Sequence, residues 1–559
     1  MKKIFSVLLC AALLTGCGNN TVAEVTSPAA ETVPAATAVA SPVYTEVEYV
    51  SRYTAVTEIV LSDSGITVDG GSETDAVYTS NDIIYYENRD TYDSGNPYGE
   101  GTDADKHTAE EAAAHTVVNI TAPGAYRVSG KLSAGQIRID LGNDAYEDPD
   151  AVVELILEGA DITCTVAPAI LFVNTYECDG LWSKDAAKAE VDTSAAGANL
   201  ILEGDNVVNG SYVAKIFKDK EGEKKLWKQD GAVYSYMSMN VFGPGYLELN
   251  AANEGLDTEL HLTVNGGNIT INSQNDGINT NEDNVSVTTI NGGNLTIFAG
   301  LGAEGDGIDS NGYLVINGGT VFSAAKPISD AGLDSDKGSF INGGMVIAMG
   351  SSMDWAESDS RQVTLNLQFA QQQKAGSKVS ITTTDGTEVF SFEDSGANAR
   401  GFSGLILSHA AFQKGETYHL YVDGVQMSYT GTDVMRGPGG FGGRPGGRPE
   451  GFDPEHMPEG FDPENMPEGF DPSKMGGRAQ RPEGEGRTPP EGFDGFKGFD
   501  PENLPEGFDP ENMPEGMERP QRPEGGFGGR GPGSAQTGEP STEFYMTDMV
   551  NAFSGITAV

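Results

Sequence analysis

The sequence predicts an all-β protein whose central third is a parallel β-helix, with one coil for each repeat of the chain. The main observation is an Asn-Gly-Gly turn followed by an apolar-polar-apolar alternation, at intervals of 26, 26 and 25 residues. The asparagines that open these repeats are Asn265, Asn291, Asn317 and Asn342. Gly-Gly is typical of a tight turn, and the alternation is typical of a half-buried strand. A period of this length, with strands and no helical pattern, indicates a β-solenoid.

A second repeated element lies between the Asn-Gly-Gly turns and supports the same prediction. It consists of a glycine, an aliphatic residue expected to point inward, and then Asp or Asn; the glycines are Gly255, Gly277, Gly307 and Gly332. Residues 230–233 and 243–249 form a degenerate fifth coil, and 136–141, 152–157 and 199–202 are expected to form earlier coils. A leucine-rich repeat would need a helix or a Leu-x-x-Leu-x-Leu frame, and neither occurs.

Residues 1–16 have the organisation of a bacterial lipoprotein signal peptide. Two lysines precede an apolar run that is too short to span a bilayer, and Leu14-Thr15-Gly16-Cys17 follows. Cys17 is the predicted lipidation site, and several acyl chains on it would anchor the protein stably to the extracellular face of the membrane. The alternative is a plain secretory peptide with an incidental cysteine. Residues 17–56 are a predicted flexible tether, because 18–43 are mainly Ala, Thr, Val, Ser and Pro.

The composition limits the partners of this protein. A formal net charge of −49 disfavours nucleic acid and anionic membrane surfaces, so a lipid anchor is the expected membrane contact. Cys164 and Cys178 are the thiols expected in the mature chain; they could pair after export, or Cys164 could be an unpaired strand residue. The six histidines are scattered without ligand spacing, which argues against zinc.

Stacking the repeats predicts columns of acidic side chains. Coils lie about 4.8 Å apart. Alignment on the second element gives three columns: Glu254, Asp276 and Asp306; Asp257, Asn279, Asp309 and Asp334; and Glu259, Asn281, Asn311 and Asp336. Two carboxylates at this spacing repel by roughly 3 kcal/mol at an effective dielectric of 20. Calcium accepts such oxygen ligands in loose geometry, and the predicted ligands are Asp276, Asn279, Asp306, Asp309, Asn311, Asp334 and Asp336. The alternative is a hydrogen-bonded ladder without metal.

Together these elements resemble a family of exported bacterial carbohydrate-binding domain proteins that are related in shape to pectate lyases. The likeness covers about residues 57–430 and rests on the repeats and on 59–70, 120–130, 135–139 and 167–170. It implies a right-handed parallel β-helix with bound calcium and affinity for polysaccharide, including acidic pectic chains and cellulose. Asp306, Asp309 and Asp334 stand in the family's acidic turns. The chain departs from the family in an acidic insertion at 71–115 and in Ala331, which replaces an expected Asp.

The distribution of cationic residues favours a binder over a lyase. Lyases of this shape need an Arg or Lys base beside calcium-bound substrate, whereas 241–345 contain only Lys326 and Lys337, both interpreted as solvated partners of the acidic columns. Basic and aromatic residues gather instead in two earlier loops, 177–191 and 209–229; the predicted ligand-binding residues there are Trp182, Lys184, Lys215, Lys218, Lys224, Lys225 and Trp227. If both loops leave the same corner of neighbouring coils, they form a shelf for sugar rings and uronates. The alternative is an ordinary charged excursion.

Three segments follow the predicted β-helix domain at 57–350. Residues 351–432 keep strand patterns, with a hairpin signal at Asp385-Gly386, and predict a small antiparallel β domain that caps the last coil. Residues 433–540 are a Gly/Pro/Glu repeat predicted to be disordered. Residues 541–559 recover apolar character and are expected to dock on the folded part or on a partner.

The sequence therefore supports three hypotheses about function. The first is a lipid-anchored, calcium-containing, non-catalytic binder of extracellular polysaccharide. The second is a calcium-dependent polysaccharide lyase, and the third is a surface scaffold or adhesin whose tail contacts other proteins.

Overall fold

The computed structural model describes residues 47–86, 105–180, 187–220, 223–351, 354–394, 396–432 and 539–559. These residues are nearly all β, arranged in sheets of 24, nine and two strands. The α-helix among them, α2 (Ala109–Ala113), has five residues. Within the described ranges no helix has the length and apolar character needed to cross a membrane. The coarse prediction of an all-β protein is confirmed.

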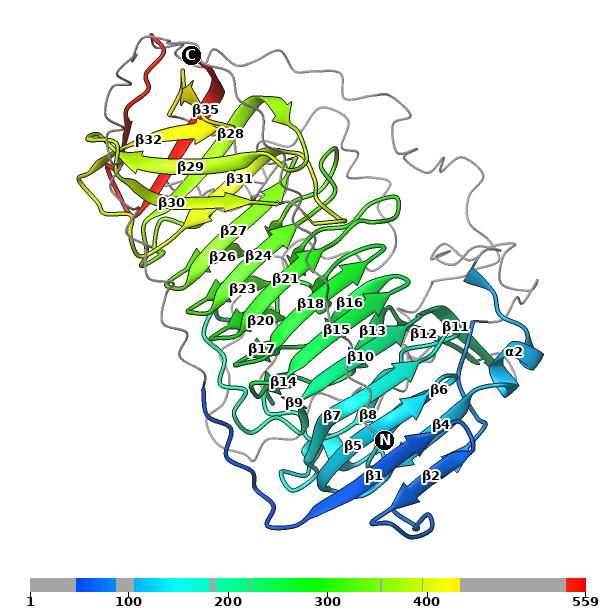
Figure 1. Ribbon diagram of the computed structural model, residues 1–559. Coiled ribbons are helices and arrows are strands. Elements are labelled where there is room, and N and C mark those ends of the chain that lie inside the picture. Colours follow the sequence, from blue (N-terminus) through cyan, green and yellow to red (C-terminus); the bar gives the residue numbers. More distant parts are fainter. Residues whose placement is uncertain are drawn as a thin grey trace, which may run out of the picture. The chain divides into compact units, whose positions relative to one another are not determined.

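Each Asn-Gly-Gly repeat contributes three short strands, and equivalent strands of successive repeats pair in parallel (Figure 1). We name the three resulting rows of strands the first, second and third ladders. The first contains β13 (Gly231–Ser235), β16 (Glu254–Thr258), β19 (Ile278–Thr280), β22 (Ile308–Ser310) and β25 (Leu333–Ser335). The second contains β14 (Met239–Phe242), β17 (Leu262–Val264), β20 (Val287–Ile290), β23 (Tyr313–Ile316) and β26 (Gly338–Ile341). The third contains β15 (Tyr246–Ala251), β18 (Asn268–Ser273), β21 (Asn294–Phe298), β24 (Thr320–Ala324) and β27 (Met345–Gly350).

The predicted earlier coils continue these ladders toward the N-terminus. The first ladder extends through β8 (Ile170–Asn174), β6 (Gly135–Asp140), β4 (Thr116–Ile120) and β3 (Val77–Ser80), of which β3 pairs antiparallel. The second extends to β9 (Ala198–Glu203) and the third to β10 (Asp205–Gly210). The long strand β7 (Val153–Thr163) pairs with both β9 and β10. On its other side β7 pairs with β5 (Gly124–Leu132), β5 pairs with β1 (Val56–Ser62), and β1 pairs antiparallel with β2 (Gly65–Val68).

The interior of the stack consists of in-register aliphatic columns. Leu256, Ile278, Ile308 and Leu333 are paired in register along the first ladder and have no exposed surface. Such columns remove apolar area from water on every coil, at roughly 25 cal/mol per Å². Because successive strand residues point to opposite faces, the residue after each of these aliphatic residues faces outward.

The Asn-Gly-Gly turns recur because the stack constrains both residue types. The second glycine of each turn has a positive φ, and at Gly319 a Cβ would lie 2.6 Å from the Gly293 carbonyl oxygen, so no side chain fits. The asparagine amides form a ladder in which Asn291 donates to Asn265, Asn317 to Asn291 and Asn342 to Asn317, each at 2.9 Å. The turn therefore satisfies its polar side chains internally.

Two N-terminal segments are more structured than their composition predicts. Part of the expected insertion at 71–115 forms β3 and α2, while 87–104 lie outside the described residues. The end of the expected tether packs on the outer surface of the stack. There the Arg52 N–H donates to Glu154 at 2.8 Å, and the rings of Tyr49 and Phe242 lie 4.6 Å apart. Residues 1–46, with Cys17, lie outside the described residues. Cys164 and Cys178 are separate thiols, so the disulfide alternative is not realised.

Mainly antiparallel strands follow the last coil. They are β28 (Thr364–Gln373), β29 (Lys378–Thr383), β30 (Glu388–Glu393), β31 (Phe402–Ser408), β32 (Thr417–Val422) and β33 (Val425–Ser428). The turn between β29 and β30 contains Asp385 and Gly386, as the hairpin signal predicts, and β31 pairs with β27, the last strand of the third ladder. The edge of that strand is therefore covered rather than exposed.

The C-terminal segment docks on this antiparallel part. Strand β35 (Val550–Ala558) pairs in parallel with β28, and β34 (Phe544–Tyr545) pairs with β32. Phe544, Met546, Phe553 and Ile556 are buried in one core with strands β28 to β32. Of the two expectations for residues 541–559, docking on the folded part is the one observed; residues 433–538 lie outside the described ranges.

Replacing Phe553 by Ala should lower the free energy of unfolding by about 3–5 kcal/mol, because the ring leaves a cavity in a packed core. Phe553 is 3% exposed, and its ring centroid lies 4.7 Å from Tyr429 and 4.9 Å from Phe544. Urea unfolding measures the change. Tyr545, in the neighbouring strand and 49% exposed, provides the control, since Tyr545→Ala should cost less than about 0.5 kcal/mol. Equal losses in the two variants would contradict a docked C-terminal segment.

Candidate functional site

The acidic columns lie on the outward face of the first ladder. Strand pairing places Asp257, Asn279, Asp309 and Asp334 side by side in one column, which confirms the alignment made from the repeat. Backbone hydrogen bonds from Gly255 to Asp276, from Gly277 to Asp306 and from Gly307 to Ala331 place the next column beside it. The two columns therefore form one continuous polar face.

Five of the predicted ligands gather on this face, and we call them the acidic stack: Asp276, Asn279, Asp306, Asp309 and Asp334. Backbone N–H groups satisfy part of it, since Asp306 N donates to Asp276 Oδ1 at 2.7 Å and Ala331 N donates to Asp306 Oδ1. Asn279 is 6% exposed; its Nδ2 donates to Glu254 Oε2 at 3.2 Å, but its Oδ1 has no hydrogen-bond partner. A buried acceptor without a partner costs about 1–3 kcal/mol.

The carboxylates of the acidic stack are held close together with little cationic compensation. Burial, and then repulsion from Asp276, Asp334 and Asp309, raises the pKa of Asp306 to about 9. Burial, followed by repulsion from Asp334 and Asp336, raises the pKa of Asp309 to about 7. The salt bridges of the described residues include none to these four carboxylates. The arrangement therefore favours proton or cation uptake.

The other two predicted ligands lie at the margin of this face. The Asn311 Nδ2 donates to the Asn281 carbonyl at 2.8 Å, and Asp336 is exposed. A carboxyl group missing from the prediction lies beyond Asp334: Asp354 Oδ2 accepts from Ser335 N at 3.1 Å, and burial, with repulsion from Asp334, raises the pKa of Asp354 to about 7. Asp354 follows the last repeat, so no alignment of repeats could find it.

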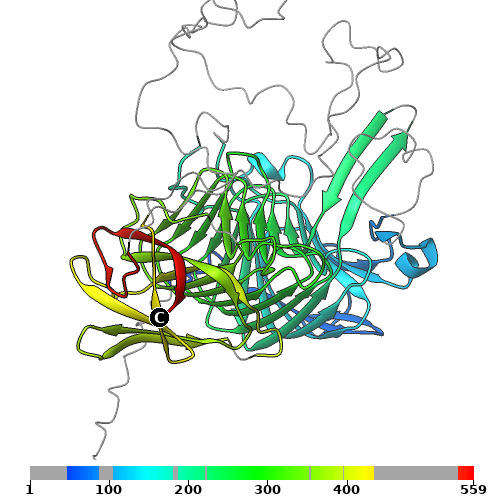
Figure 2. The ribbon, with the colours of Figure 1, turned by 90° about the horizontal axis from the view of Figure 1, so that it is seen from above.

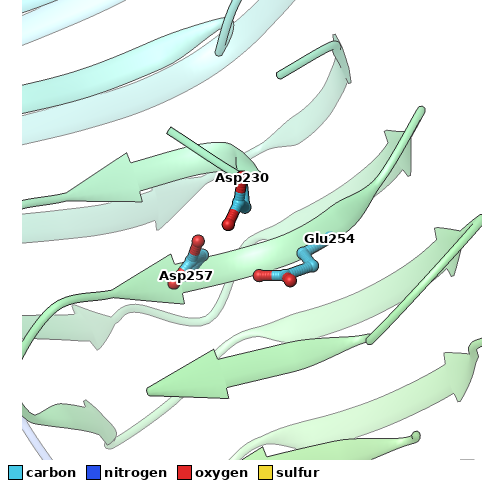
Figure 3. Close-up of side chains that lie close together, drawn as sticks. All are labelled: Asp230, Glu254 and Asp257. Atoms are coloured by element: carbon cyan, nitrogen blue, oxygen red, sulfur yellow. The ribbon is translucent and has the colours of Figure 1, made fainter. Parts of the chain in front are cut away.

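A second group of acids, outside the predicted ligand set, lies at the N-terminal side of the stack. The carboxylates of Asp230, Glu254 and Asp257 converge, with one oxygen from each within 4.8 Å of the others, and all three residues are buried (Figure 3). We call them the acid cluster. Lys228 Nζ lies 2.8 Å from Asp230 Oδ2. Glu254 and Asp257 stand in the predicted columns, whereas Asp230 belongs to the degenerate coil, in which Gly231 rather than Asp230 pairs with Glu254.

The two lysines within the repeats contact backbone carbonyls. Lys326 Nζ donates to the Gly302 oxygen. Lys337 Nζ donates to the Asn284 oxygen at 3.3 Å and lies 5.2 Å from the centre of the Tyr313 ring. These contacts replace the interpretation that both lysines are solvated partners of the acidic columns.

The segment 209–229, predicted to be a loop, contains an antiparallel hairpin. Strands β11 (Val213–Lys220) and β12 (Glu223–Gln229) pair with each other and with neither large sheet, and Figure 2 shows them as a separate pair. The predicted ligand-binding residues Lys218 and Lys225 are directly paired across the two strands, and Asp219 is paired with Lys224. Lys215 and Trp227 also belong to these strands.

The two basic segments do not leave one corner of the stack, so that expectation is wrong. The loop with 177–191 follows β8, whereas the hairpin precedes β13, the parallel neighbour of β8. They therefore lie at opposite ends of the first-ladder strands. Glu177 fixes the base of the loop by accepting from Ser238 N and Oγ at 2.7 and 2.9 Å. Trp182 and Lys184 lie outside the described residues.

These features define an acidic, nearly all-β protein with a polar face built from repeats. Residues 114–405 match the model of a family described as carbohydrate-binding domain-containing proteins. This match spans just over half of the 559 residues, and the chain belongs to this family.

Two further comparisons show similar proteins. A carbohydrate-binding domain-containing protein of Acetivibrio thermocellus is 30% identical over 155 residues, which are 28% of this chain and 44% of that protein. The chain thus matches less than half the length of this relative. A solved structure described as a polysaccharide lyase-like protein from C. thermocellum, a gadolinium derivative, is 22% identical and covers 52% of this chain and 93% of that one, with a TM-score of 0.30.

In the absence of divalent cations, stability should fall as pH rises from about 4 to about 9. An Asp with an ordinary pKa near 3.8 has lost its proton over this range, while folded Asp309 and Asp306 keep theirs up to about 7 and 9. The folded state therefore binds more protons than the unfolded state, and this stabilisation disappears as pH passes the raised pKa values. Thermal unfolding in chelating buffer at several pH values measures the slope.

The variant Asp306→Asn isolates this effect. It should weaken the dependence of stability on pH. Near pH 9 without cations, its free energy of unfolding should exceed that of the wild type by at least about 1.4 kcal/mol, the free energy of one pKa unit. Asp283→Asn, at an exposed position in the same set of turns, should show the same dependence of stability on pH as the wild type. A stability that is constant or rises across the range would contradict the electrostatic description of the stack.

Proposed function

We propose that this protein binds extracellular polysaccharide without cleaving it, by means of a calcium-containing right-handed parallel β-helix. The observation that carries the proposal is the acidic outer face of the first ladder in a member of a carbohydrate-binding family. Acidic pectic chains and cellulose-like glycans are the proposed ligand classes. Calcium on an acidic face could bridge it to uronate carboxylates.

The parallel ladders support the β-helical part of the proposal. Three strands from each repeat pair in register with the equivalent strands of the next repeat. Crossover connections between parallel strands are right-handed in about 98% of cases, which favours a right-handed coil. An experimental structure of residues 47–432 with 539–559 would test the handedness directly.

The donor set supports calcium as the resident ion. The acidic stack offers four carboxylates and the unpartnered Asn279 Oδ1, all of them oxygen ligands. Calcium accepts six to eight such oxygens in flexible geometry, whereas magnesium needs near-ideal octahedral geometry and keeps several waters. A bound ion would supply positive charge that neutralises the stack and polarises a bound carboxylate. Asp276, Asn279, Asp306, Asp309 and Asp334 would hold it, with Asn311 and Asp336 as outer members of the proposed set.

The contacts of the cationic residues support a binder rather than a lyase. A lyase base must lie within hydrogen-bond reach of the proton it removes. The Lys326 and Lys337 ammonium groups donate to backbone carbonyls instead. The lysines of the hairpin are therefore proposed to neutralise uronates, and Trp182, Lys184 and Trp227 to complete the sugar-binding residues.

Display on the cell surface is a further part of the proposal. It rests on the lipoprotein box that ends at Cys17. Several acyl chains on this cysteine would make the anchoring stable, and co-fractionation of the intact protein with membranes is the measurement for it.

Calcium should stabilise the protein through the acidic stack. At a calcium concentration about a hundred times the dissociation constant, the expected gain is about 2.7 kcal/mol. Thermal unfolding with calcium and with chelator measures it. Asp309→Asn should remove most of the gain, whereas Asp283→Asn should keep it, because Asp283 is exposed and lies outside the column of Asp309. A gain that persists in Asp309→Asn would place the calcium elsewhere.

Removing lysines from the hairpin should weaken the retention of the protein in polygalacturonate gels. The double variant Lys218→Ala/Lys225→Ala is expected to lose about two- to thirtyfold in affinity, since exposed charge contacts contribute about 0.2–1 kcal/mol each. Affinity electrophoresis with calcium or chelator measures this loss, with a gel of neutral cellulose derivative run in parallel.

The matched control for this test removes two lysines from the antiparallel part, Lys374→Ala/Lys378→Ala. Both residues are exposed there, and the control changes net charge by the same amount. An equal loss in the control would show that retention reports only overall charge. Release of unsaturated, ultraviolet-absorbing sugar from polygalacturonate would contradict the non-catalytic proposal and establish a lyase.

A further inference from the structure

The acid cluster differs from the acidic stack in its ligands and in its surroundings. Asp230 comes from the turn before β13, whereas Glu254 and Asp257 come from β16, the next strand of the first ladder. Their exposed fractions are 8%, 4% and 0%. In Figure 3 the three carboxylates point into one common space. Three buried carboxylates around one space need a positive partner.

The hydrogen bonds of the cluster leave ligand atoms unused. Asp257 Oδ1 accepts from Asn281 Nδ2 at 2.6 Å, but Asp257 Oδ2 is buried and has no hydrogen-bond partner. Asn279 of the acidic stack contributes its amide Nδ2, which donates to Glu254 Oε2 at 3.2 Å. An unused carboxylate oxygen on Asp257, a residue with no exposed surface, is a second indication of a cation site, independent of the number of acids.

Lys228 supplies one positive charge to this cluster. Its Nζ lies 2.8 Å from Asp230 Oδ2 and 3.2 Å from Asn281 Oδ1, so it reaches across neighbouring coils. Burial alone would lower the pKa of Lys228, but attraction by Asp230, Glu254 and Asp257 outweighs burial and raises it. One ammonium faces three carboxylates, so two negative charges are left over when all three are ionised.

We propose that the acid cluster is a second divalent-cation site, in which a calcium ion and the Lys228 ammonium compete for the same three carboxylates. With Lys228 in place, one of the three negative charges of the cluster is compensated from within the chain. A divalent ion enters only as the lysine leaves, and Asp230, Glu254 and Asp257 then become its ligands.

The size of the cluster suits calcium. Calcium lies 2.3–2.6 Å from its oxygens, so two ligands on opposite sides of the ion are up to about 5 Å apart, whereas magnesium brings them to about 4.2 Å or less. The carboxylate oxygens of the cluster lie within 4.8 Å of one another. They can therefore share one calcium ion without a change in the backbone.

The test counts calcium ions in the full chain by titration calorimetry. The background variant Asp306→Asn/Asp309→Asn disables the acidic stack, so that binding in this background reports the acid cluster. Adding Lys228→Met to it should create one calcium site, or tighten an existing one by about tenfold or more, because the competing charge is gone. Lys228→Arg keeps the charge and should neither create a calcium site nor tighten an existing one.

Lys337→Met provides the matched control, since Lys337 contacts a carbonyl and an aromatic ring rather than the cluster. It should leave the calcium count of the background variant unchanged. Terbium luminescence gives a second readout, because Tyr234 pairs in register with Asp257 and can sensitise an ion bound there. A folded Lys228→Met protein with neither an added site nor tighter binding overturns the proposal, and so does an equal gain in Lys337→Met.

If Lys228→Met fails to fold, the wild-type protein still tests the proposal. Calcium above the concentration that saturates the acidic stack should accelerate acetylation of Lys228 relative to Lys337, because the displaced ammonium becomes accessible. Mass spectrometry of the peptides measures the ratio. A ratio that stays constant over about a hundredfold further increase in calcium overturns the competition.

Discussion

The whole structure depends on in-register parallel stacking, in which every coil places the same side chain about 4.8 Å above its equivalent. In-register stacking stabilises some residue types and destabilises others. Leu256, Ile278 and Ile308 gain apolar contacts by standing in a column, and the turn asparagines gain amide hydrogen bonds along another. Carboxylates in the same arrangement repel one another, so an acidic column persists only where protons, cations or other polar groups compensate it.

The outward face of the first ladder uses different compensation at different coils. At β13, Tyr234 occupies the register position of Asp257, and its hydroxyl donates to Glu259. At the next coil the Lys228 ammonium faces the acid cluster. From β19 onward the described residues contribute no salt bridge to the column, and the pKa values of Asp306 and Asp309 rise instead. The compensation of this face therefore changes along the stack, from a tyrosine hydroxyl to one ammonium and then to proton uptake.

Periodic features of the molecule could be predicted from the sequence, because stacking converts equal sequence spacing into spatial contact. The first and third ladders and the column of Asp257, Asn279, Asp309 and Asp334 follow from the repeat alone, whereas the second ladder was not predicted. Features that break the period could not be predicted. Asp230 belongs to a coil whose register is offset by one residue, and the contact of β35 with β28 joins segments that are separated by the whole Gly/Pro/Glu repeat. The hairpin escaped prediction because its alternating charges resemble a solvated loop.

The hairpin and the acidic face are joined by one residue, and this junction connects the two parts of the proposed function. Lys228 belongs to β12, which carries the proposed sugar-binding lysines, yet its ammonium contacts Asp230 and Asn281 of the first ladder. The ion pair therefore holds the end of β12 against the acids. Because the opposite ends of the first-ladder strands carry the hairpin and the 177–191 loop, a glycan that reached both would run across the acidic face between them. Under the proposed function, cations on that face would reduce its repulsion toward a uronate chain.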